Sequence, residues 1–381
     1  MTFFDPVATQ PGLGSTHSGQ SRSDSPTVSV VATAPETAVA DMGRAMDLAG
    51  ISEFLSPEIK TFLKVNISWQ HWYPGCSTTP WQIEGVAKAL EDLGHNDLVA
   101  AHNGTVVVDS YEGELKNKHK AAQDRVGLPD IHLDSEPNGW VDYKPKADML
   151  VLDDIFPEGI QIPESFPGTN IVHLPTMKTH VFTTMTGAMK NAFGGLLHRK
   201  RHWTHSVIHE TLTDLLAIQK EIHPGLFAVM DGTFAGDGPG PRAMRWHIKD
   251  RILASNDQVA IDAVAAKMMG FDPMSIKFIR LAHERGLGCG DVSQINIVGE
   301  DISQVNWQFT GVENTFASRG QKLIYWGPLK PLEKMLLRSP IVGWAFLASN
   351  LYHNGYWLKT KGRRRINAAL KTEWGKLFQS Y

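Results

Sequence analysis

The strongest constraint on the fold is a unit in which a buried strand, a polar loop, a helix and a second strand follow one another. The run TFLKVNIS, residues 61–68, is mainly apolar and is typical of an interior strand. After the loop, Pro80 opens the segment PWQIEGVAKALEDLG, in which apolar residues recur at helical spacing as far as Gly94, a type of residue that ends helices. The run DLVAAHN then predicts the next strand. Strands joined through a helix form a parallel sheet with right-handed crossovers, so this unit predicts an α/β fold.

Further short apolar runs extend this pattern as far as about residue 300. We expect strands at residues 147–155 and 169–175, a helix over residues 205–222, and a strand in LFAVMDG. The segments RILAS, NDQVAIDAVAAKMMG and QINIVGE then predict a strand, a helix and a strand. Together they predict a domain over residues 41–300 with a mostly parallel sheet covered by helices. Within the second helix, Asp257 is placed to cap the first turn, whereas Asp262 lies on an apolar face and needs a partner.

Composition limits the surroundings and the ligands of this domain. Residues 1–40 are rich in Ser, Thr, Pro, Gly and Ala, so we expect a disordered leader ahead of the domain. The net charge of −3 argues against general binding of nucleic acid. The two cysteines cannot supply the roughly four thiolates of an iron–sulfur cluster, so no such cluster is expected. No secretory signal pattern precedes the domain, and we therefore expect a cytoplasmic protein.

The main candidate site lies in residues 178–205, KTHVFTTMTGAMKNAFGGLLHRKRHWTH. Lys178 and Lys190 flank a segment rich in Thr, Gly and Ala, whose hydroxyl groups and Gly187 can bring backbone N–H groups close to an anion. Lysines among small apolar neighbours are more typical of a cleft than of a solvated face. The stretch therefore predicts a site for a small carboxylate or phosphate. The alternative is that both lysines are ordinary surface charges.

Polar residues at other predicted strand ends are expected to complete this site. Because ligands bind at the carboxyl ends of parallel strands, side chains that follow the strands should converge with the lysines. The candidate catalytic residues are His180, Lys190, His205 and Asp231, and the candidate substrate-binding residues are Lys64, Asn66, Lys178, Asn191, Asp237 and Gly238. One of the two histidines would act as general acid or base, oriented by an aspartate.

The histidines of the same stretch support a second hypothesis, in which the site holds a metal. They recur three or four residues apart between residues 198 and 209, so a continuous helix would place several of them on one face. Imidazole and carboxylate donors suit a divalent metal such as zinc, nickel or iron, with His180, His202 and His205 as candidate ligands. The alternative is a helix start with exposed basic residues, because spacing alone is a weak signal.

Residues 301–381 form a C-terminal extension in which the regular pattern fades. Its aromatic part, within residues 332–365, is interrupted by Ser, Asn and His and ends in the basic run KTKGRRR. A membrane-spanning helix needs roughly 20 predominantly apolar residues, so we expect peripheral contact with a membrane surface and no span. The alternative is that these aromatic residues cover the core.

Several motifs resemble the family known as domain of unknown function 362. They are KVN with PGCSTTP, KTH with TGAMKNAFG, DG with GDGPGP, then ASNDQVAIDAVAAKMMG, and GLG with INIVGE, over about residues 62–300. The family is largely without an assigned reaction, so the resemblance implies site residues without roles: Lys178, His180, Lys190, Asn191 and His205. Some relatives carry an added iron–sulfur module, whereas this chain has no cysteine-rich segment. The arrangement of Lys and His also looks, more distantly, like the N-terminal domain of nickel-pincer lactate racemases, a likeness of fold that carries no chemistry.

Two hypotheses about function follow. The first is an enzyme, an isomerase or an oxidoreductase, that acts on a small anionic metabolite. The second is a non-catalytic cofactor-binding or assembly factor that docks at a membrane through residues 332–365. A pocket in which Lys, His and Asp side chains converge favours the enzyme, and a flat surface favours the binding protein.

Overall fold

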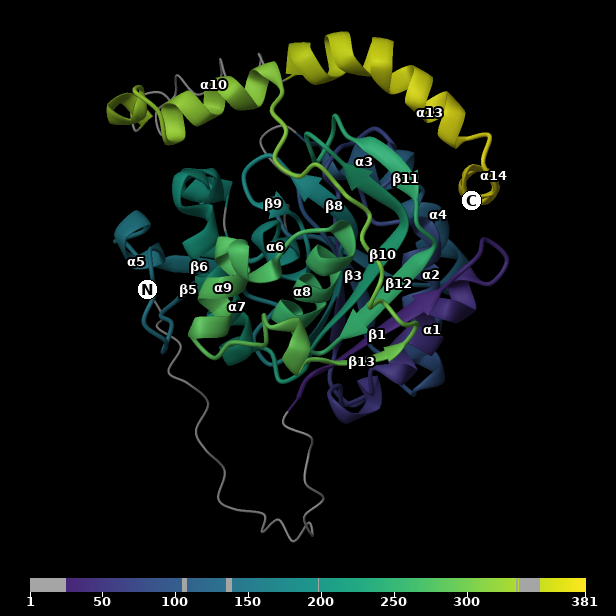
Figure 1. Ribbon diagram of the computed structural model, residues 1–381. Helices are drawn as coiled ribbons and strands as arrows, with labels where there is room; N and C mark the ends of the chain where they lie inside the picture. The colour runs from purple at the N-terminus through teal and green to yellow at the C-terminus, as the bar shows by residue number, and fades with distance from the viewer. Residues whose placement is uncertain (1–24, 105–107, 135–138, 198, 334, 336–349) are drawn as a thin grey trace, which may run out of the picture.

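Apolar runs that alternate with helices build one large sheet. The computed structural model describes residues 25–104, 108–134, 139–197, 199–333, 335 and 350–381 (Figure 1). The main path of the sheet has the strand order β13-β1-β12-β10-β7-β2-β3-β4. In chain order these strands are β1 (Thr27–Ala32), β2 (Thr61–Val65), β3 (Leu98–His102), β4 (Asp130–His132), β7 (Asn170–Leu174), β10 (Leu226–Asp237), β12 (Arg251–Ser255) and β13 (Asn296–Gly299).

One half of this sheet is parallel. The strands β10, β7, β2, β3 and β4 are parallel neighbours in that order. Every residue of β2, β3 and β7 is buried, as in strands that helices cover on both faces. β12 runs antiparallel to both of its neighbours, and β13 runs parallel to β1. The predicted α/β fold with a mostly parallel sheet is confirmed.

Helices cover the two faces of the sheet (Figure 1). Side chains alternate between the faces along a strand, so Ile171 packs in one core and its neighbour Val172 in the other. The first core includes side chains of α6 (Ala188–Phe193), α7 (Ile208–Ile222), α8 (Gln258–Met269) and α9 (Lys277–Glu284). The second includes side chains of α1 (Ala38–Leu48), α2 (Pro80–Asp92) and α4 (His119–Val126).

The disordered leader expected over residues 1–40 is wrong for its last part. β1 pairs with β12 and β13, and α1 begins at Ala38. Val28 and Val30 are completely buried. The Ser, Thr and Pro residues around this short β-branched run obscured it, because the strand is stabilised by partners 225 and 269 residues away in the chain.

The strand expected at residues 147–155 does not form. One helical turn, α5 (Leu152–Ile155), lies there instead. Asp214 of α7 accepts hydrogen bonds from the backbone N–H groups of Leu150, Val151 and Leu152 at 2.7, 3.0 and 3.1 Å. A short apolar run does not distinguish a strand from other buried conformations. Here a distant carboxylate binds the N–H groups that a sheet would have used.

Smaller elements lie around this framework. β8 (Thr176–His180) pairs with β10 and with β9 (Thr184–Met185), and β11 (Arg245–Ile248) pairs with the far end of β10. A separate two-stranded sheet consists of β5 (Trp140–Tyr143) and β6 (Ile160–Pro163). α3 (Ser110–Lys116) lies between β3 and α4 in the chain.

The C-terminal extension packs back onto this body. It contains α10 (Phe316–Tyr325), a π-helix (Leu351–Gly362), α13 (Arg363–Ala369) and α14 (Glu373–Ser380), and residues 336–349 of the expected membrane segment lie outside the described residues. Trp357 and Trp374 are only 4% and 2% exposed, so these two aromatic residues cover the core. Among the helices that the structure describes, none has the length and apolar character needed to cross a membrane.

Candidate functional site

A pocket with about 320 Å³ of empty space, part of it open to solvent, lies beside the carboxyl ends of β2 and β7. Five residues that the sequence placed at the site line it together, from the loop after β2, from β8 and from α6. They are Asn66, Lys178, His180, Lys190 and Asn191, and the other lining residues are Ser68, Pro175, Thr186, Gly187 and Pro241. The carboxyl ends of parallel strands are the usual position of a ligand in an α/β sheet.

β8 supplies a lysine and a histidine to one wall. Lys178 and His180 are two residues apart on this strand, so their side chains lie on the same face. They are 1% and 6% exposed. The motif KTH therefore places a lysine and an imidazole next to each other, because it forms a strand and alternate side chains share one face.

A buried carboxylate positions α6, which forms another wall. Asp262 of α8 accepts hydrogen bonds from the N–H groups of Ala188 and Met189 at 2.6 and 3.1 Å. The first N–H groups of a helix have no partner within the helix, so Asp262 has found the partner that it needs. A Cβ atom on Gly187 would lie 2.1 Å from Asp262 Oδ1, so only glycine fits there. The backbone N–H groups that we expected to bind an anion are therefore occupied by Asp262.

Asn191 ties α6 to the sheet. Its Nδ2 donates to Lys64 O of β2 at 2.7 Å and lies 3.3 Å from His173 Nδ1 of β7. Asn191, which was expected to bind substrate, thus lines the cavity. Its hydrogen bond to β2 also fixes the position of α6, and so of Lys190, relative to the sheet.

The two lysine ammonium groups of the cavity have no acidic partner among the residues that the structure describes. Lys178 Nζ donates to Thr176 Oγ1 at 2.5 Å. Lys190 Nζ lies 5.2 Å from the centre of the Phe193 ring. Burial lowers the pKa of each lysine to about 8, so both are largely protonated at neutral pH. The lysine side chains of the cavity are therefore buried and positively charged.

His180 is held as a neutral imidazole. The Phe182 N–H donates to His180 Nδ1 at 3.2 Å, which leaves the ring proton on Nε2. Burial holds the pKa of His180 well below its usual value, and the charges of Lys190 and His205 act in the same direction. His180 is thus a hydrogen-bond donor through Nε2.

His205 lies outside the cavity wall and in the opposite tautomer. Its Nδ1 lies 2.9 Å from the carbonyl oxygen of His202, so Nδ1 carries the proton. Its ring is stacked against Tyr325 with the ring centres 6.0 Å apart. Burial lowers the pKa of His205 to about 4. His205 therefore does not line the cavity, but it lies close enough for its charge to lower the pKa of His180.

The metal site predicted at His180, His202 and His205 is not formed. Among the described residues, one group brings three potential ligand atoms within 4.8 Å of one another, and it consists of His102, Glu114 and Asp130. The predicted spacing assumed a continuous α-helix, whereas residues Arg199–Val207 form a 3-10 helix that directs the imidazoles differently.

Asp231 has a structural role in place of the predicted catalytic one. It is 1% exposed and accepts hydrogen bonds from the Thr233 N–H at 2.6 Å, from Trp81 Nε1 at 3.0 Å and from the Thr79 hydroxyl group. Burial raises the pKa of this carboxyl group. Asp231 joins β10 to α2 and orients no histidine.

The glycine-rich loop likewise faces away from the cavity at its two predicted residues. Asp237 pairs with Arg245 at 2.8 Å and accepts the Thr310 N–H at 2.8 Å. These contacts lower the pKa of Asp237, although burial alone would raise it. The carbonyl group of Gly238 accepts a hydrogen bond from Thr179 Oγ1 at 2.8 Å. This loop therefore supports β8, and Pro241 is its contribution to the cavity wall.

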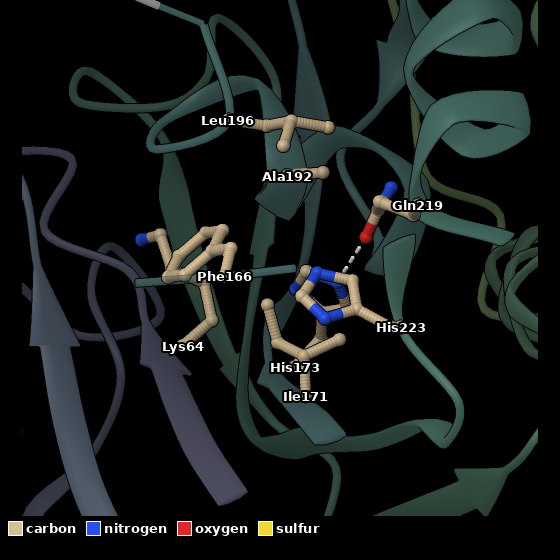
Figure 2. A pocket seen from close by; sticks show the side chains of 8 residues that line it. All are labelled: Lys64, Phe166, Ile171, His173, Ala192, Leu196, Gln219 and His223. Atoms are coloured by element: carbon tan, nitrogen blue, oxygen red, sulfur yellow. Dashed lines mark hydrogen bonds between the residues drawn. The ribbon is translucent and has the colours of Figure 1, made fainter. Parts of the chain in front are cut away.

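Lys64 faces a second, smaller space of about 180 Å³ (Figure 2). Its Nζ donates to Asn103 Oδ1 at 2.8 Å and to Val65 O at 2.5 Å. Burial lowers the pKa of Lys64 to about 7. Figure 2 shows His173 bonded to Gln219 on the far side of this space, at 2.6 Å. Lys64 therefore does not line the anion cavity. It contacts the cavity residue Asn191 through its backbone oxygen.

Two arginines that the sequence analysis did not single out add positive charge. Arg242 follows Pro241 and donates from Nε to Ser68 O at 3.1 Å. Arg201 is 7% exposed, and its charge contributes to the lowered pKa values of both Lys190 and Lys64. Both lie next to motif residues, in GPGPR and HRKRH, and that adjacency was the available signal.

Comparisons with known proteins find a family model, a sequence relative and a solved structure. A sequence model of the family described as Domain of unknown function (DUF362) matches residues 61–267. A thylakoid-associated protein of Synechocystis, sll1697, is 23% identical over 256 residues, which is 63% of this chain and 72% of that protein. A crystal structure of a Thermotoga maritima protein superposes with a TM-score of 0.33 at 11% identity, covering 70% of this chain and 61% of that one.

Proposed function

This chain belongs to the DUF362 family, and we propose that it is an enzyme that binds a small carboxylate or phosphate in its lysine-lined cavity and moves a proton on that ligand. The proposal is supported by one observation above the others. Lys178 and Lys190 line one buried cavity and pair with no carboxylate among the described residues. Two buried ammonium groups of like charge are costly without a counter-ion, and a bound anion would supply it.

The three cavity groups suit different roles in this reaction. Lys178 is fixed by Thr176 and would hold the anionic group of the ligand. Lys190 makes no hydrogen bond within the described residues, and burial lowers its pKa to about 8, close to the working pH of a general acid or base. His180, neutral and protonated on Nε2, would donate a hydrogen bond to an oxygen atom that gains charge in the transition state.

The test is anion binding by a variant that keeps the shape of the side chain. Lys190→Met removes the charge and preserves most of the length. We expect inorganic phosphate or acetate to raise the melting temperature of the parent, and the variant to bind that anion at least about tenfold more weakly, since a hydrogen bond to a charged group contributes about 1.5–3 kcal/mol. Mass spectrometry of small molecules released from the denatured parent then identifies the natural ligand.

Two controls sharpen this test. Lys371→Met removes an exposed lysine and should leave the anion effect unchanged. His180→Gln should retain binding of the identified ligand and lose its turnover. An equal anion effect in the parent and in Lys190→Met would place anion binding elsewhere and contradict the proposal.

A second candidate function is docking at a membrane surface. Five apolar side chains in and after α10 are 40–50% exposed, and they are Leu323, Trp326, Leu329, Leu332 and Met335. Exposed apolar residues combined with basic ones are typical of proteins that bind the membrane interface. The name of the Synechocystis relative, a thylakoid-associated protein, also favours this function.

A further inference from the structure

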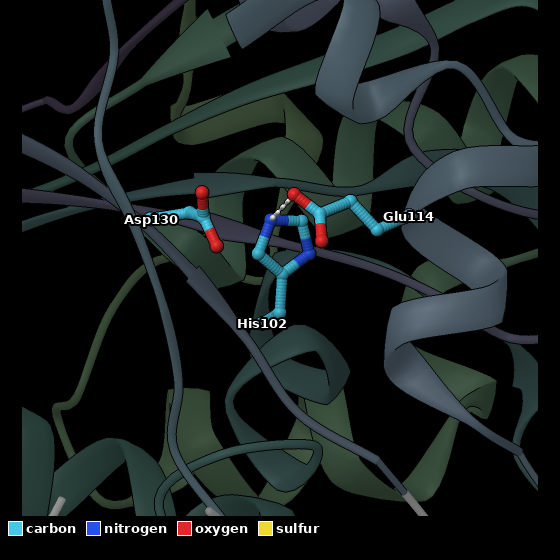
Figure 3. A group of neighbouring side chains, drawn as sticks. All are labelled: His102, Glu114 and Asp130. Carbon is cyan, nitrogen blue, oxygen red and sulfur yellow. Dashed lines mark ion pairs between the residues drawn. The ribbon is translucent and has the colours of Figure 1, made fainter. Parts of the chain in front are cut away.

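A cluster of histidine and carboxylate side chains lies at the edge of the sheet, apart from the anion cavity. His102 ends β3, and His132 ends β4 directly beside it. Asp130 is two residues before His132, so both point to the same face of the sheet. Glu114 of α3 lies over this face, opposite His102 (Figure 3). Two strands and one helix therefore bring ligand atoms of His102, Glu114 and Asp130 within 4.8 Å of one another, and His132 lies beside them, 3.1 Å from Glu114.

The donor atoms have the spacing of a ligand shell. Glu114 Oε2 lies 3.1 Å from His132 Nε2, and Glu114 Oε1 lies 3.7 Å from His102 Nε2. Asp130 Oδ2 lies 3.7 Å from His132 Nε2. Two donors at about 2.1 Å from one tetrahedral zinc ion lie roughly 3.4 Å apart, so these separations need little adjustment.

The cluster is buried and only partly hydrogen-bonded. His102, His132 and Glu114 are 0%, 5% and 6% exposed. Glu114 Oε1 and His102 Nδ1 have no hydrogen-bond partner among the described groups. A buried acceptor without a partner costs about 1–3 kcal/mol, and more for a charged group. A cation bound at Glu114 Oε1 would remove that cost.

Neighbouring side chains hold the imidazole rings and carboxylates of the cluster in place. Ser110 Oγ lies 2.8 Å from His132 Nδ1, which leaves Nε2 of that ring directed at Glu114. The Gln123 amide lies 2.7 Å from His102 Nε2, so a cation bound at this nitrogen would displace that hydrogen bond. Lys120 lies 3.5 Å from Asp130 Oδ1, so Oδ2 remains for a second contact.

We propose that His102, Glu114, Asp130 and His132 form a binding site for a divalent cation of the zinc class. Two imidazole nitrogens with two carboxylate oxygens suit zinc or its neighbours better than magnesium or calcium, which prefer oxygen ligands alone. The competing explanation is a metal-free network in which His132 donates a hydrogen bond to Glu114. The sequence analysis missed this group because its members lie on two strands and a helix, with no spacing motif.

The experiment uses the full chain, freed of metal by a chelator and titrated with cobalt(II) as the probe. We expect one equivalent of cobalt with visible d–d absorption, and displacement by zinc. Glu114→Gln keeps the shape of the side chain and should weaken cobalt binding at least about 100-fold, because even second-shell changes cost 10–100-fold. Glu112→Gln, on the same helix but paired with Lys116, is the matched control and should bind as the parent does.

The outcomes separate the two explanations. A parent that binds no stoichiometric cobalt or zinc, or a Glu114→Gln variant that binds both as tightly as the parent, would overturn the metal site in favour of the hydrogen-bond network. Circular dichroism of each variant checks its folding. If Glu114→Gln does not fold, His132→Gln takes its place with the same expected loss and the same contradicting result.

Discussion

A single buried carboxylate, Asp262, determines where the helix that carries Lys190 begins. It binds the first N–H groups of α6 from a different helix, and no side chain larger than glycine fits at Gly187 between them. The position of Lys190, for which we propose a catalytic role, therefore depends on a residue that does not line the cavity.

This carboxylate should leave a signature in the pH dependence of stability. Burial raises the pKa of Asp262 to about 7, above its unfolded value of 3.8. Between these values the folded state holds a proton that the unfolded state has lost, so the contribution of Asp262 to the free energy of unfolding falls as the pH rises. Asp262→Asn does not titrate. Its free energy of unfolding, relative to the parent, should rise by on the order of a few kcal/mol from about pH 4 to pH 7.

Urea denaturation of the parent and of Asp262→Asn at several pH values measures this difference directly. Taking the difference cancels the buried histidines, whose lowered pKa values act in the opposite direction over the same range. A difference that stays constant with pH would show that Asp262 is ionised in the folded protein throughout.

The sequence predicted five of the cavity residues because they follow strands or sit in one motif. It could not predict the roles of Asp231 and Asp237. Asp231 is bonded to Trp81, 150 residues away, and Asp237 pairs with Arg245. An Asp-Gly pair has the same local sequence whether the carboxylate binds a ligand or an indole. Its role depends on tertiary contacts that the local sequence does not reveal.

At the scale of elements, α14 illustrates how the C-terminal extension stabilises the domain. Trp374 packs against Trp81 with ring centres 5.2 Å apart and donates from Nε1 to Asp250 at 2.7 Å. Phe378 stacks on Trp72 with ring centres 4.2 Å apart. The helix therefore closes the second core over α2 and the loop before it.

Trp374→Ala should lower the free energy of unfolding by about 3–5 kcal/mol, the usual cost of removing a buried aromatic side chain. Urea denaturation followed by circular dichroism measures it. Trp326→Ala removes the same side chain from a position that is 44% exposed and should cost less than about 1 kcal/mol. Equal losses in the two variants would mean that α14 is not a structural part of the domain.

Element prediction succeeded where periodicity was strong and failed where pairing was remote. α2 and α8 show helical spacing with clear ends, and both form within a residue or two of their expected limits. β1 and residues 147–155 are short runs whose conformation depends on partners far along the chain. A short segment carries too little local preference to resist such contacts.

At the scale of the whole molecule, α10 and α13 lie along one side of the body (Figure 1). Exposed basic residues gather in and next to α13 and include Lys359, Lys361, Arg363 and Arg364. Each basic residue near an anionic membrane contributes about 1 kcal/mol of attraction. We therefore expect the parent to sediment with vesicles that contain anionic lipid, and the double variant Lys361→Gln/Arg364→Gln to bind them roughly 30-fold more weakly.

The double variant Lys88→Gln/Lys116→Gln removes the same charge from α2 and α3 and serves as the control. Neutral vesicles should bind the parent far less than anionic ones. If the two double variants lose affinity for the vesicles equally, the attraction depends on the net charge of the protein. That result would contradict binding through the side that carries α13.

The position of β1 in the sheet affects how the chain folds during its synthesis. Ser29 is hydrogen-bonded to Ala254 of β12, and Thr27 to Asn296 of β13. The two partner residues are therefore synthesised 225 and 269 residues after β1. At the usual synthesis rate of 5–20 residues per second, β1 waits roughly 10–50 seconds before a partner emerges from the ribosome. Throughout that interval Val28, Val30 and Val31, which are buried in the folded protein, have no partner strand. An unpaired apolar strand is prone to aggregation, so we expect the nascent chain to be most vulnerable before β12 has been synthesised.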